Sequence, residues 1–150
     1  MSVESDVSIR ALKASDREAW EGLFRGYINF YEAKVTEDVI ALTWRRLISG
    51  EDGFLGLVAV DAADTPIGIA HVIFHPSTWS PTTYCYLEDL FVDRGARRHG
   101  IGRELIKAVY EEADRRGATR TYWATRDDNS QARRLYDRVA SLSPFVQYRR

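Results

Sequence analysis

The sequence predicts one domain over residues 1–150, an α+β fold or α/β sandwich in which a mixed sheet carries helices on both faces. Three observations predict it. The length of 150 residues is that of a single domain. Some segments alternate apolar and polar residues as strands do, while others repeat apolar residues at helical spacing. These segments follow one another in the order βααβββαβαβ, with no internal repeat and no linker.

The order begins with a strand and a helix. Val7–Lys13 alternates apolar and polar residues, which is typical of a half-buried strand. Ser15 and Glu18 have the spacing of a capping box, in which a hydroxyl and a carboxylate each bond a free backbone N–H at a helix start. We therefore expect a helix from this point to about Phe30.

A second helix and three strands follow. Thr36 can cap a helix whose first turn holds two carboxylates, which the helix dipole favours. Gly50 stands where that helix should end. The next three segments are rich in apolar, β-branched and aromatic residues between turn residues, so we expect strands over Phe54–Asp61, Ile67–His75 and Thr83–Val92.

The last part of the chain holds the clearest helix. Leu105, Val109 and Ala113 follow Ile101 at four-residue intervals, which gives one apolar face, and Gly117 is placed to end the helix. The remaining elements are a strand over Thr119–Thr125, a short helix from a cap at Asn129 or Ser130 to about Val139, and a final strand over Phe145–Arg149.

Composition excludes several classes of protein. The single cysteine, Cys85, cannot form an internal disulfide, which argues against a disulfide-rich secreted protein and favours a small apolar filler. No run of 18 apolar residues is present, so we expect no transmembrane helix. The first ten residues carry Glu4 and Asp6 and lack the apolar core of a secretory signal. We therefore expect a cytoplasmic protein.

Charge is divided unevenly along the chain. Residues 1–90 carry a net charge of −7 and residues 91–150 carry +6, within a total of −1. A general nucleic-acid binder would be basic overall or over one broad face, so this division argues against that class. It reflects either an ordinary scatter of surface charge or one domain that binds both an anionic and a cationic ligand.

A loop rich in glycine and arginine joins the strand ending at Val92 to the strong helix. Gly100 and Gly102 let the backbone approach a ligand closely, and the first turn of a helix offers N–H groups to an anion. Leu105 stands where a dinucleotide-binding fingerprint needs a third small residue, and Arg103 stands where a P-loop needs its lysine. The loop therefore predicts a phosphate or pyrophosphate site of another kind.

The pattern Arg97-x-x-Gly100-x-Gly102 resembles the coenzyme A signature of the GNAT superfamily of N-acetyltransferases. Tyr86–Val92 is similar to the central strand of diamine acetyltransferases and of small histone or amino-acid N-acetyltransferases. Asn129-x-x-Ala132-x-x-Leu135-Tyr136 resembles the second signature of the superfamily. The resemblance covers nearly the whole chain and implies a mostly antiparallel sheet flanked by helices.

The resemblance also implies acetyl-CoA as the cosubstrate. The backbone of Leu90, Phe91 and Val92 would pair with the pantetheine arm, and Asn129 would contact that arm or the pyrophosphate, although it can equally be a simple helix cap. The residues expected to hold the pyrophosphate are Arg97, Arg98, His99, Gly100, Ile101, Gly102 and Arg103.

Two side chains are candidates for the chemistry. Tyr136 holds the tyrosine position of the superfamily and would protonate the leaving thiolate, unless it is only a core aromatic residue. Glu88 would accept the proton of the amine or orient it, unless it is a hydrogen-bonded carboxylate that braces the sheet. Asp89 fits that bracing role better, and the N–H of Leu90 is our candidate oxyanion donor.

The acceptor is expected to be a primary amine. The segment Tyr27–Lys34 resembles one wall of the amine site, where Tyr31 and Glu32 would contact a small diamine, an amino acid or a lysine side chain.

His71 and His75 are too far apart on a strand to share a metal ion, so we expect no metal. The alternative function is a non-catalytic acyl-CoA sensor. The resemblance makes a homodimer through Phe145–Arg149 plausible.

Overall fold

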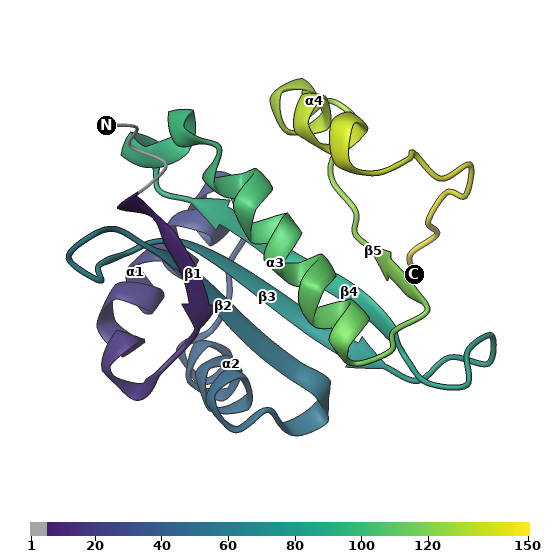
Figure 1. Ribbon diagram of the computed structural model, residues 1–150, viewed down its shortest axis with the longest axis horizontal. Helices are drawn as coiled ribbons and strands as arrows, with labels where there is room; N and C mark the ends of the chain where they lie inside the picture. Colours follow the sequence, from purple (N-terminus) through teal and green to yellow (C-terminus); the bar gives the residue numbers. More distant parts are fainter. Residues whose placement is uncertain (1–5) are drawn as a thin grey trace.

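The computed structural model describes residues 6–150, without the side chains of residues 97–99. Five strands form one sheet in the order β1-β2-β3-β4-β5 (Figure 1). The first four are antiparallel neighbours, and β5 runs parallel to β4. The strands are β1 (Ser8–Ala11), β2 (Phe54–Val60), β3 (Pro66–His75), β4 (Tyr84–Val92) and β5 (Arg120–Tyr122).

The helices cover both faces of this sheet. They are α1 (Arg17–Phe30), α2 (Glu37–Ser49), α3 (Ile101–Arg115) and α4 (Ser130–Val139), with 3₁₀ turns η2 (Ala14–Asp16), η3 (Glu51–Gly53) and η4 (Arg94–His99). In Figure 1, α3 crosses the sheet and α4 lies beyond the β5 edge. The predicted α+β class and mixed sheet are confirmed.

Two apolar cores follow from the alternation of side chains along the strands. Leu57 and Ala59 of β2 pack with Leu105 and Val109 of α3. Their neighbour Val58 faces the other way and packs with helices α1 and α2. This alternation confirms that β2 is covered on both faces, as the sequence predicts.

Most helix boundaries are as predicted. The Thr36 hydroxyl accepts the Val39 N–H at 3.3 Å at the start of α2. Gly50 adopts the left-handed conformation that ends α2, and Gly117 does so after α3. The amide oxygen of Asn129 accepts the Ala132 N–H at 3.4 Å, which caps α4.

The expected capping box at Ser15 and Glu18 is wrong. The helical segment begins two residues earlier, with Lys13 as its N-cap, where the Asp16 carboxylate accepts the Lys13 N–H at 2.9 Å. Asp16 is held there because it also pairs with Arg10 of β1, at 2.7 Å, while only 4% exposed. A contact from another element therefore decides where the helical segment starts.

The expected final strand over Phe145–Arg149 is also wrong. The structure assigns no strand after α4, and the fifth strand ends the sheet within the described residues. A strand needs a partner edge for its backbone N–H and C=O groups, and this segment makes no ladder with β5. Phe145, Val146 and Tyr148 are instead 88%, 77% and 92% exposed.

Across the described part of the chain, residues 6–150, no helix is long and apolar enough to cross a bilayer.

Candidate active site

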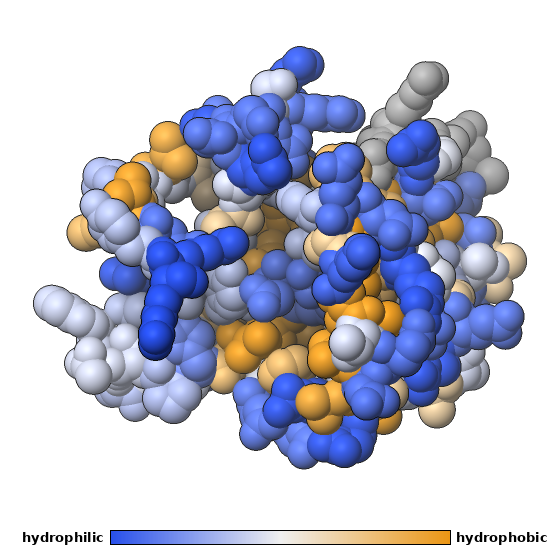
Figure 2. Space-filling view, turned by 180° about the vertical axis from the view of Figure 1, so that it is seen from behind, coloured by the Kyte–Doolittle hydropathy of each residue, from blue (hydrophilic) through white to orange (hydrophobic). Residues whose placement is uncertain are grey.

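The site begins where β4 and β5 separate. The two strands pair only from Tyr84 to Tyr86, and β5 ends opposite the latter residue. Strand β4 continues to Val92, held on its other side by β3, with Ala70 opposite Leu90. The segment expected to bind pantetheine, which includes Leu90, Phe91 and Val92, therefore lies beyond the end of β5. Viewed from behind, Figure 2 shows the molecule hollowed between the part that carries α4 and the part that carries α1.

A β-bulge interrupts β4 at Glu88. His71 of β3 lies opposite Asp89 while the next residue of β3, Val72, lies opposite Leu87, so Glu88 has no opposite residue. A bulge changes which face the following side chains take. Leu87 and Leu90 therefore both pack into the core beneath α3. Glu88 therefore does not share the face of Leu90 and Val92, as strict alternation along the strand would require.

Glu88 lies among aromatic hydroxyl groups. Its side chain keeps exposed surface, and it shares a hydrogen bond with the Tyr86 hydroxyl. Partial desolvation and the charge of Asp89 raise the pKa of Glu88 above its ordinary value. Burial and the charge of Glu88 raise the pKa of Tyr86 to about 12. Glu88 is therefore an accessible carboxylate with an increased affinity for a proton.

Tyr136 is held by packing on α4. Its ring lies 5.4 Å from the Trp123 ring, nearly perpendicular to it. The Tyr110 hydroxyl of α3 donates to the carbonyl of Val139 at 2.8 Å, which ties the end of α4 to α3. Burial, with a smaller contribution from Tyr31, raises the pKa of Tyr136 to about 12. The phenol therefore keeps its proton at neutral pH.

The end of α1 forms the facing wall. The Tyr31 ring contacts the rings of Tyr27 and Phe30 at 5.0 Å and 5.1 Å. Tyr27 hydrogen-bonds Asp89, next to Glu88. Tyr31 also contributes to the raised pKa of Tyr136, so this wall lies near both candidate catalytic residues.

Glu32, predicted to contact the amine, lies just past α1. It adopts a left-handed backbone conformation with φ of 53° and its side chain is exposed. Its charge acts on Arg126, in the loop between β5 and α4, whose nearer partner is Asp128 at 3.1 Å. Glu32 therefore lies at the rim of the hollow rather than beside Glu88.

A second aromatic group on β3, β4 and β5 was not predicted. The Tyr122 ring stacks on Tyr86 at 4.8 Å, and its hydroxyl donates to His75 Nε2 at 2.7 Å. His75 in turn donates from Nδ1 to the Pro76 carbonyl, and its ring contacts Tyr84. The parallel pairing of β4 and β5 assembles this group, and only the aromatic alternation of Tyr84 and Tyr86 could have indicated it.

The glycine loop leads into α3. Gly100 has φ of 68°, a conformation that favours glycine, and it occupies the N-cap position, where it has no side chain to cap the helix. A Cβ on Gly102 would lie 3.3 Å from Leu135 of α4, so the two helices approach closely here. Ile101 is 1% exposed and can offer a ligand only its backbone, while Arg103 is exposed. The side chains of Arg97, Arg98 and His99 lie outside the described part of the chain.

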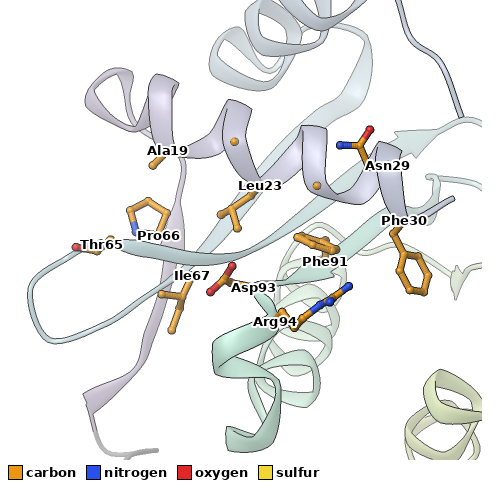
Figure 3. A pocket seen from close by; sticks show the side chains of 12 residues that line it. Ala19, Leu23, Asn29, Phe30, Thr65, Pro66, Ile67, Phe91, Asp93 and Arg94 are labelled. Carbon is orange, nitrogen blue, oxygen red and sulfur yellow. The ribbon is translucent and has the colours of Figure 1, made fainter. Parts of the chain in front are cut away.

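A cavity of about 650 Å³ lies on the α1 side, under one face of that helix (Figure 3). Gly22 and Gly26 line its wall on α1, and Phe91, Asp93 and Arg94 line it from the end of β4. Figure 3 shows the Arg94 side chain extending toward Phe30. Of the residues predicted to bind acetyl-CoA whose side chains the structure describes, only Phe91 contributes to this cavity.

His71 and Cys85 lie in the interior beside the site. His71 is 3% exposed and hydrogen-bonded on both ring nitrogens, so it is a satisfied interior histidine. Cys85 is fully buried in the core beneath α3, as predicted, and burial raises the pKa of its thiol. Among the residues whose side chains are described, no group of three histidine, cysteine or acidic residues could hold a metal ion.

Comparison with known sequences identifies relatives along nearly the whole chain. Residues 17–140 match the model of the Acetyltransferase (GNAT) family. The chain is 34% identical over 149 residues to the D-amino-acid N-acetyltransferase HPA3 of Saccharomyces cerevisiae, covering 99% of this chain and 92% of that protein. It is also 34% identical over 87 residues to a thialysine N-epsilon-acetyltransferase of Caenorhabditis elegans, which covers 58% of this chain and 51% of that one.

Solved structures share the fold. AAC(6')-Iy in complex with the bisubstrate analogue CoA-S-monomethyl-acetylneamine superposes with a TM-score of 0.82 at 19% identity, covering 96% of this chain and 97% of that one. An acetyltransferase of Trypanosoma brucei gives a TM-score of 0.76 at 20% identity over 96% and 98% of the two chains. With the family match over residues 17–140, these findings show that the chain belongs to the GNAT acetyltransferase family and is an acyltransferase enzyme.

Proposed function

We propose that this enzyme transfers the acetyl group of acetyl-CoA to a primary amine, which attacks the thioester directly. One observation carries the proposal. Glu88, with a raised pKa, lies on β4, and Tyr136, with a pKa of about 12, lies on α4, so the two come from different elements beside the hollow. One is suited to accept a proton and the other to donate one.

The residues along the hollow fit acetyl-CoA. The β4 backbone from Leu90 to Val92 lies beyond the end of β5, where it can pair with the amide groups of a pantetheine arm. The first turn of α3, after Gly100, is suited to a pyrophosphate, since its N–H groups have no capping side chain at that position and helix N-termini favour anions. Arg97, Arg98, His99, Ile101, Gly102 and Arg103 would complete the pyrophosphate site, and Asn129 would add a contact from the start of α4.

Glu88 performs the first step. An ammonium group cannot attack, so Glu88 takes its proton, directly or through one water, and the free amine then forms a bond to the acetyl carbon. The raised pKa of Glu88 helps because a base is most effective when its pKa lies near the working pH. The Leu90 N–H, past the bulge, would stabilise the oxygen of the tetrahedral intermediate.

Tyr136 completes the reaction. As the carbon–sulfur bond breaks, the phenol donates its proton to the sulfur and CoA leaves as a thiol. A protonated phenol with a pKa of about 12 is available throughout the neutral range. The nitrogen bonded to the acetyl group then loses its extra proton, through water, to the Tyr136 phenolate, and the proton held by Glu88 returns to solvent.

The acceptor fits the acidic and aromatic surroundings of the hollow. Glu88 and Asp89 carry the negative charge, while Tyr31 and Tyr86 offer ring surface to a cation or a carbon chain. Glu32 would attract the amine at the rim. The named activities of the two relatives, on D-amino acids and on thialysine, support amino acids and lysine-like side chains as acceptors alongside small diamines.

We further propose a homodimer that forms through the C-terminal segment. Leu142, Phe145, Val146 and Tyr148 are all exposed large apolar or aromatic residues, and within the described residues β5 pairs only with β4. An unpaired sheet edge beside an exposed extended segment favours strand addition between copies.

The single buried Cys85 suits a reducing compartment, and we propose the cytoplasm.

A thiol-release assay tests the function. Acetyl-CoA is mixed with the enzyme and with D- and L-amino acids, lysine peptides and small diamines, and both CoA thiol and acetylated amine are measured. We expect equal amounts of the two products with at least one acceptor. Tight acetyl-CoA binding without thiol release for any amine would contradict the proposal and favour a non-catalytic acyl-CoA sensor.

A further inference from the structure

Three side chains from three elements form a buried chain behind Glu88. Trp20 of α1 is fully buried, and its indole Nε1–H donates to His71 Nε2 at 2.8 Å. His71 Nδ1 lies 2.9 Å from Asp89 Oδ2. Asp89 follows the bulge residue Glu88 directly. The chain therefore connects the core of α1 to the part of β4 that carries the proposed base.

The hydrogen bonds determine the orientation and the tautomer of His71. An indole nitrogen only donates, so Nε2 accepts from Trp20. The ring proton that faces Asp89 is then on Nδ1, which donates to the carboxylate. Trp20 therefore fixes the tautomer of the imidazole.

The surroundings leave this arrangement little freedom. Phe24 packs edge-on against the His71 ring at 4.9 Å, and Trp20 lies 5.8 Å from it. Tyr27 bonds Asp89 from the end of α1. Asp89 accordingly accepts from donors on β3 and α1, which fix the position of its side chain.

We propose that Trp20, His71 and Asp89 are positioning residues that fix the β4 bulge and hold the Asp89 carboxylate next to Glu88. The inference rests on the proposed function, in which Glu88 accepts the proton of the amine. The groups that face Glu88 are Asp89 and Tyr86 on β4, His71 on β3, Tyr122 on β5 and Tyr27 on α1. Asp89 is the one carboxylate among these five, so its charge increases the affinity of Glu88 for a proton.

The first test replaces the charge and keeps the shape. The amide oxygen of Asp89→Asn can still accept the His71 N–H, so the geometry is retained while the charge is lost. We expect the acid side of the pH profile of kcat/KM to move down by about one pH unit. Asp114→Asn, the same change on the exposed surface of α3, is the matched control and should leave the profile in place. A folded Asp89→Asn enzyme whose acid side does not move would overturn the proposal.

The second test needs no catalysis. Carbon-13 NMR of carboxyl-labelled glutamate, with Glu88 assigned from Glu88→Gln, should show Glu88 titrating at lower pH in Asp89→Asn than in the wild type. An unchanged Glu88 titration would overturn the role of the charge. If the wild type transfers no acetyl group, the proposed function fails, and this measurement still decides the inference.

The third test addresses the tryptophan. Nitrogen-15 NMR of labelled histidine at one fixed pH should show His71 as the Nδ1–H tautomer. Trp20→Phe removes the indole N–H, so we expect the Nε2 resonance of His71 to shift as its hydrogen-bond donor is lost. Trp44→Phe, which changes an indole that stacks on Trp20 at 5.0 Å, should leave the Nε2 resonance in place. An unmoved Nε2 resonance in Trp20→Phe, or the opposite tautomer in the wild type, would overturn the proposal.

Discussion

At the scale of single residues, Glu88 gains its properties from its neighbours. A glutamate on an ordinary strand would alternate to one face, but the bulge leaves it unpaired beside Asp89. Desolvation and that adjacent charge raise its pKa. Its proposed role as a base depends on both effects.

Glu88→Gln should therefore affect the rate most in a defined pH range. Glu88 must be ionised to act, so the wild-type rate falls as pH falls through its raised pKa. Above the pKa of the amine, the acceptor is already free and needs no base. We expect kcat/KM of the variant to be reduced between these two values and to approach the wild type at higher pH. The full pH–rate profile measures this, and equal rates throughout would contradict the role.

Tyr136→Phe tests the proposed acid. The phenylalanine ring can keep the contact with Trp123 but cannot donate a proton to the sulfur. We expect kcat for thiol release to fall about 100-fold, with little change in KM for acetyl-CoA. Steady-state kinetics distinguishes this from a packing role, for which thermal stability would fall while kcat remained near the wild-type value.

The sequence could predict which residues to test but not their partners. Tyr136 and Glu88 stand at positions recognisable from the local pattern of residues. The hydrogen bond to Tyr86, the stacked Tyr122 and the link from Trp20 to His71 all join segments far apart in the chain. Such contacts depend on register and on the bulge, which the local sequence does not specify.

At the scale of elements, Asp16 joins β1 to the start of α1. Arg10 and the Lys13 N–H lower the pKa of Asp16, so its contribution to stability is present at neutral pH and is lost as pH falls through the acid range. We expect Asp16→Asn to reduce the free energy of unfolding by about 2 kcal/mol at pH 7. The difference from the wild type should narrow below about pH 4.

Denaturant unfolding at pH 7 and at pH 3 measures this difference. Asp64→Asn is the matched control, because Asp64 also pairs with Arg10 but is half exposed. Asp64→Asn should reduce the free energy of unfolding by less than Asp16→Asn does. Equal losses from the two variants, or a loss independent of pH, would contradict the assignment.

Gly50 and Gly53, at the two ends of η3, differ in how closely they pack on their surroundings. Both have positive φ, 74° at Gly50 and 80° at Gly53. A Cβ on Gly53 would lie 2.0 Å from the carbonyl oxygen of Phe74 in β3, whereas on Gly50 it would meet its nearest atom at 3.8 Å. We expect Gly50→Ala to reduce the free energy of unfolding by about 1 kcal/mol, and Gly53→Ala to reduce it by about 3 kcal/mol or more. Urea unfolding of both variants tests this, and similar losses would be inconsistent with the close packing of η3 on β3.

Local patterns predicted most elements because their signals are local. Thr36, Gly50 and Gly117 delimit helices through bonds within a few residues. The start of the first helical segment and the absence of a strand over Phe145–Arg149 depend instead on distant partners, Arg10 in the first case and a free sheet edge in the second. Sequence alternation shows that a segment can be a strand, but not that an edge is present to receive it.

At the scale of the whole molecule, the division of charge matches a two-ligand site. The acidic half supplies Glu88 and Asp89, and the basic half supplies the loop that leads into α3. Strand β4, which carries both carboxylates, leads directly into this loop. A cationic amine and an anionic cosubstrate would each approach a region of opposite charge.

The exposed C-terminal segment predicts association of whole molecules. Val146→Asp places a charge among side chains that we expect to meet a second copy. Analytical ultracentrifugation should show a dimer for the wild type and a monomer for the variant. Because Val146 is 77% exposed in the single chain, the fold of each subunit should be unaffected. A monomeric wild type would exclude this interface.

The central claim is that Glu88 and Tyr136 lie on either side of the reacting atoms. A crystal structure with a bisubstrate analogue, in which the CoA sulfur is joined to the amine, tests it most directly. We predict the Tyr136 hydroxyl at about 3 Å from the sulfur, and the Glu88 carboxylate at hydrogen-bond distance from the amine nitrogen or from one water bound to it. A complex in which the sulfur lies in the α1 cavity beside Arg94, away from both residues, would contradict the account.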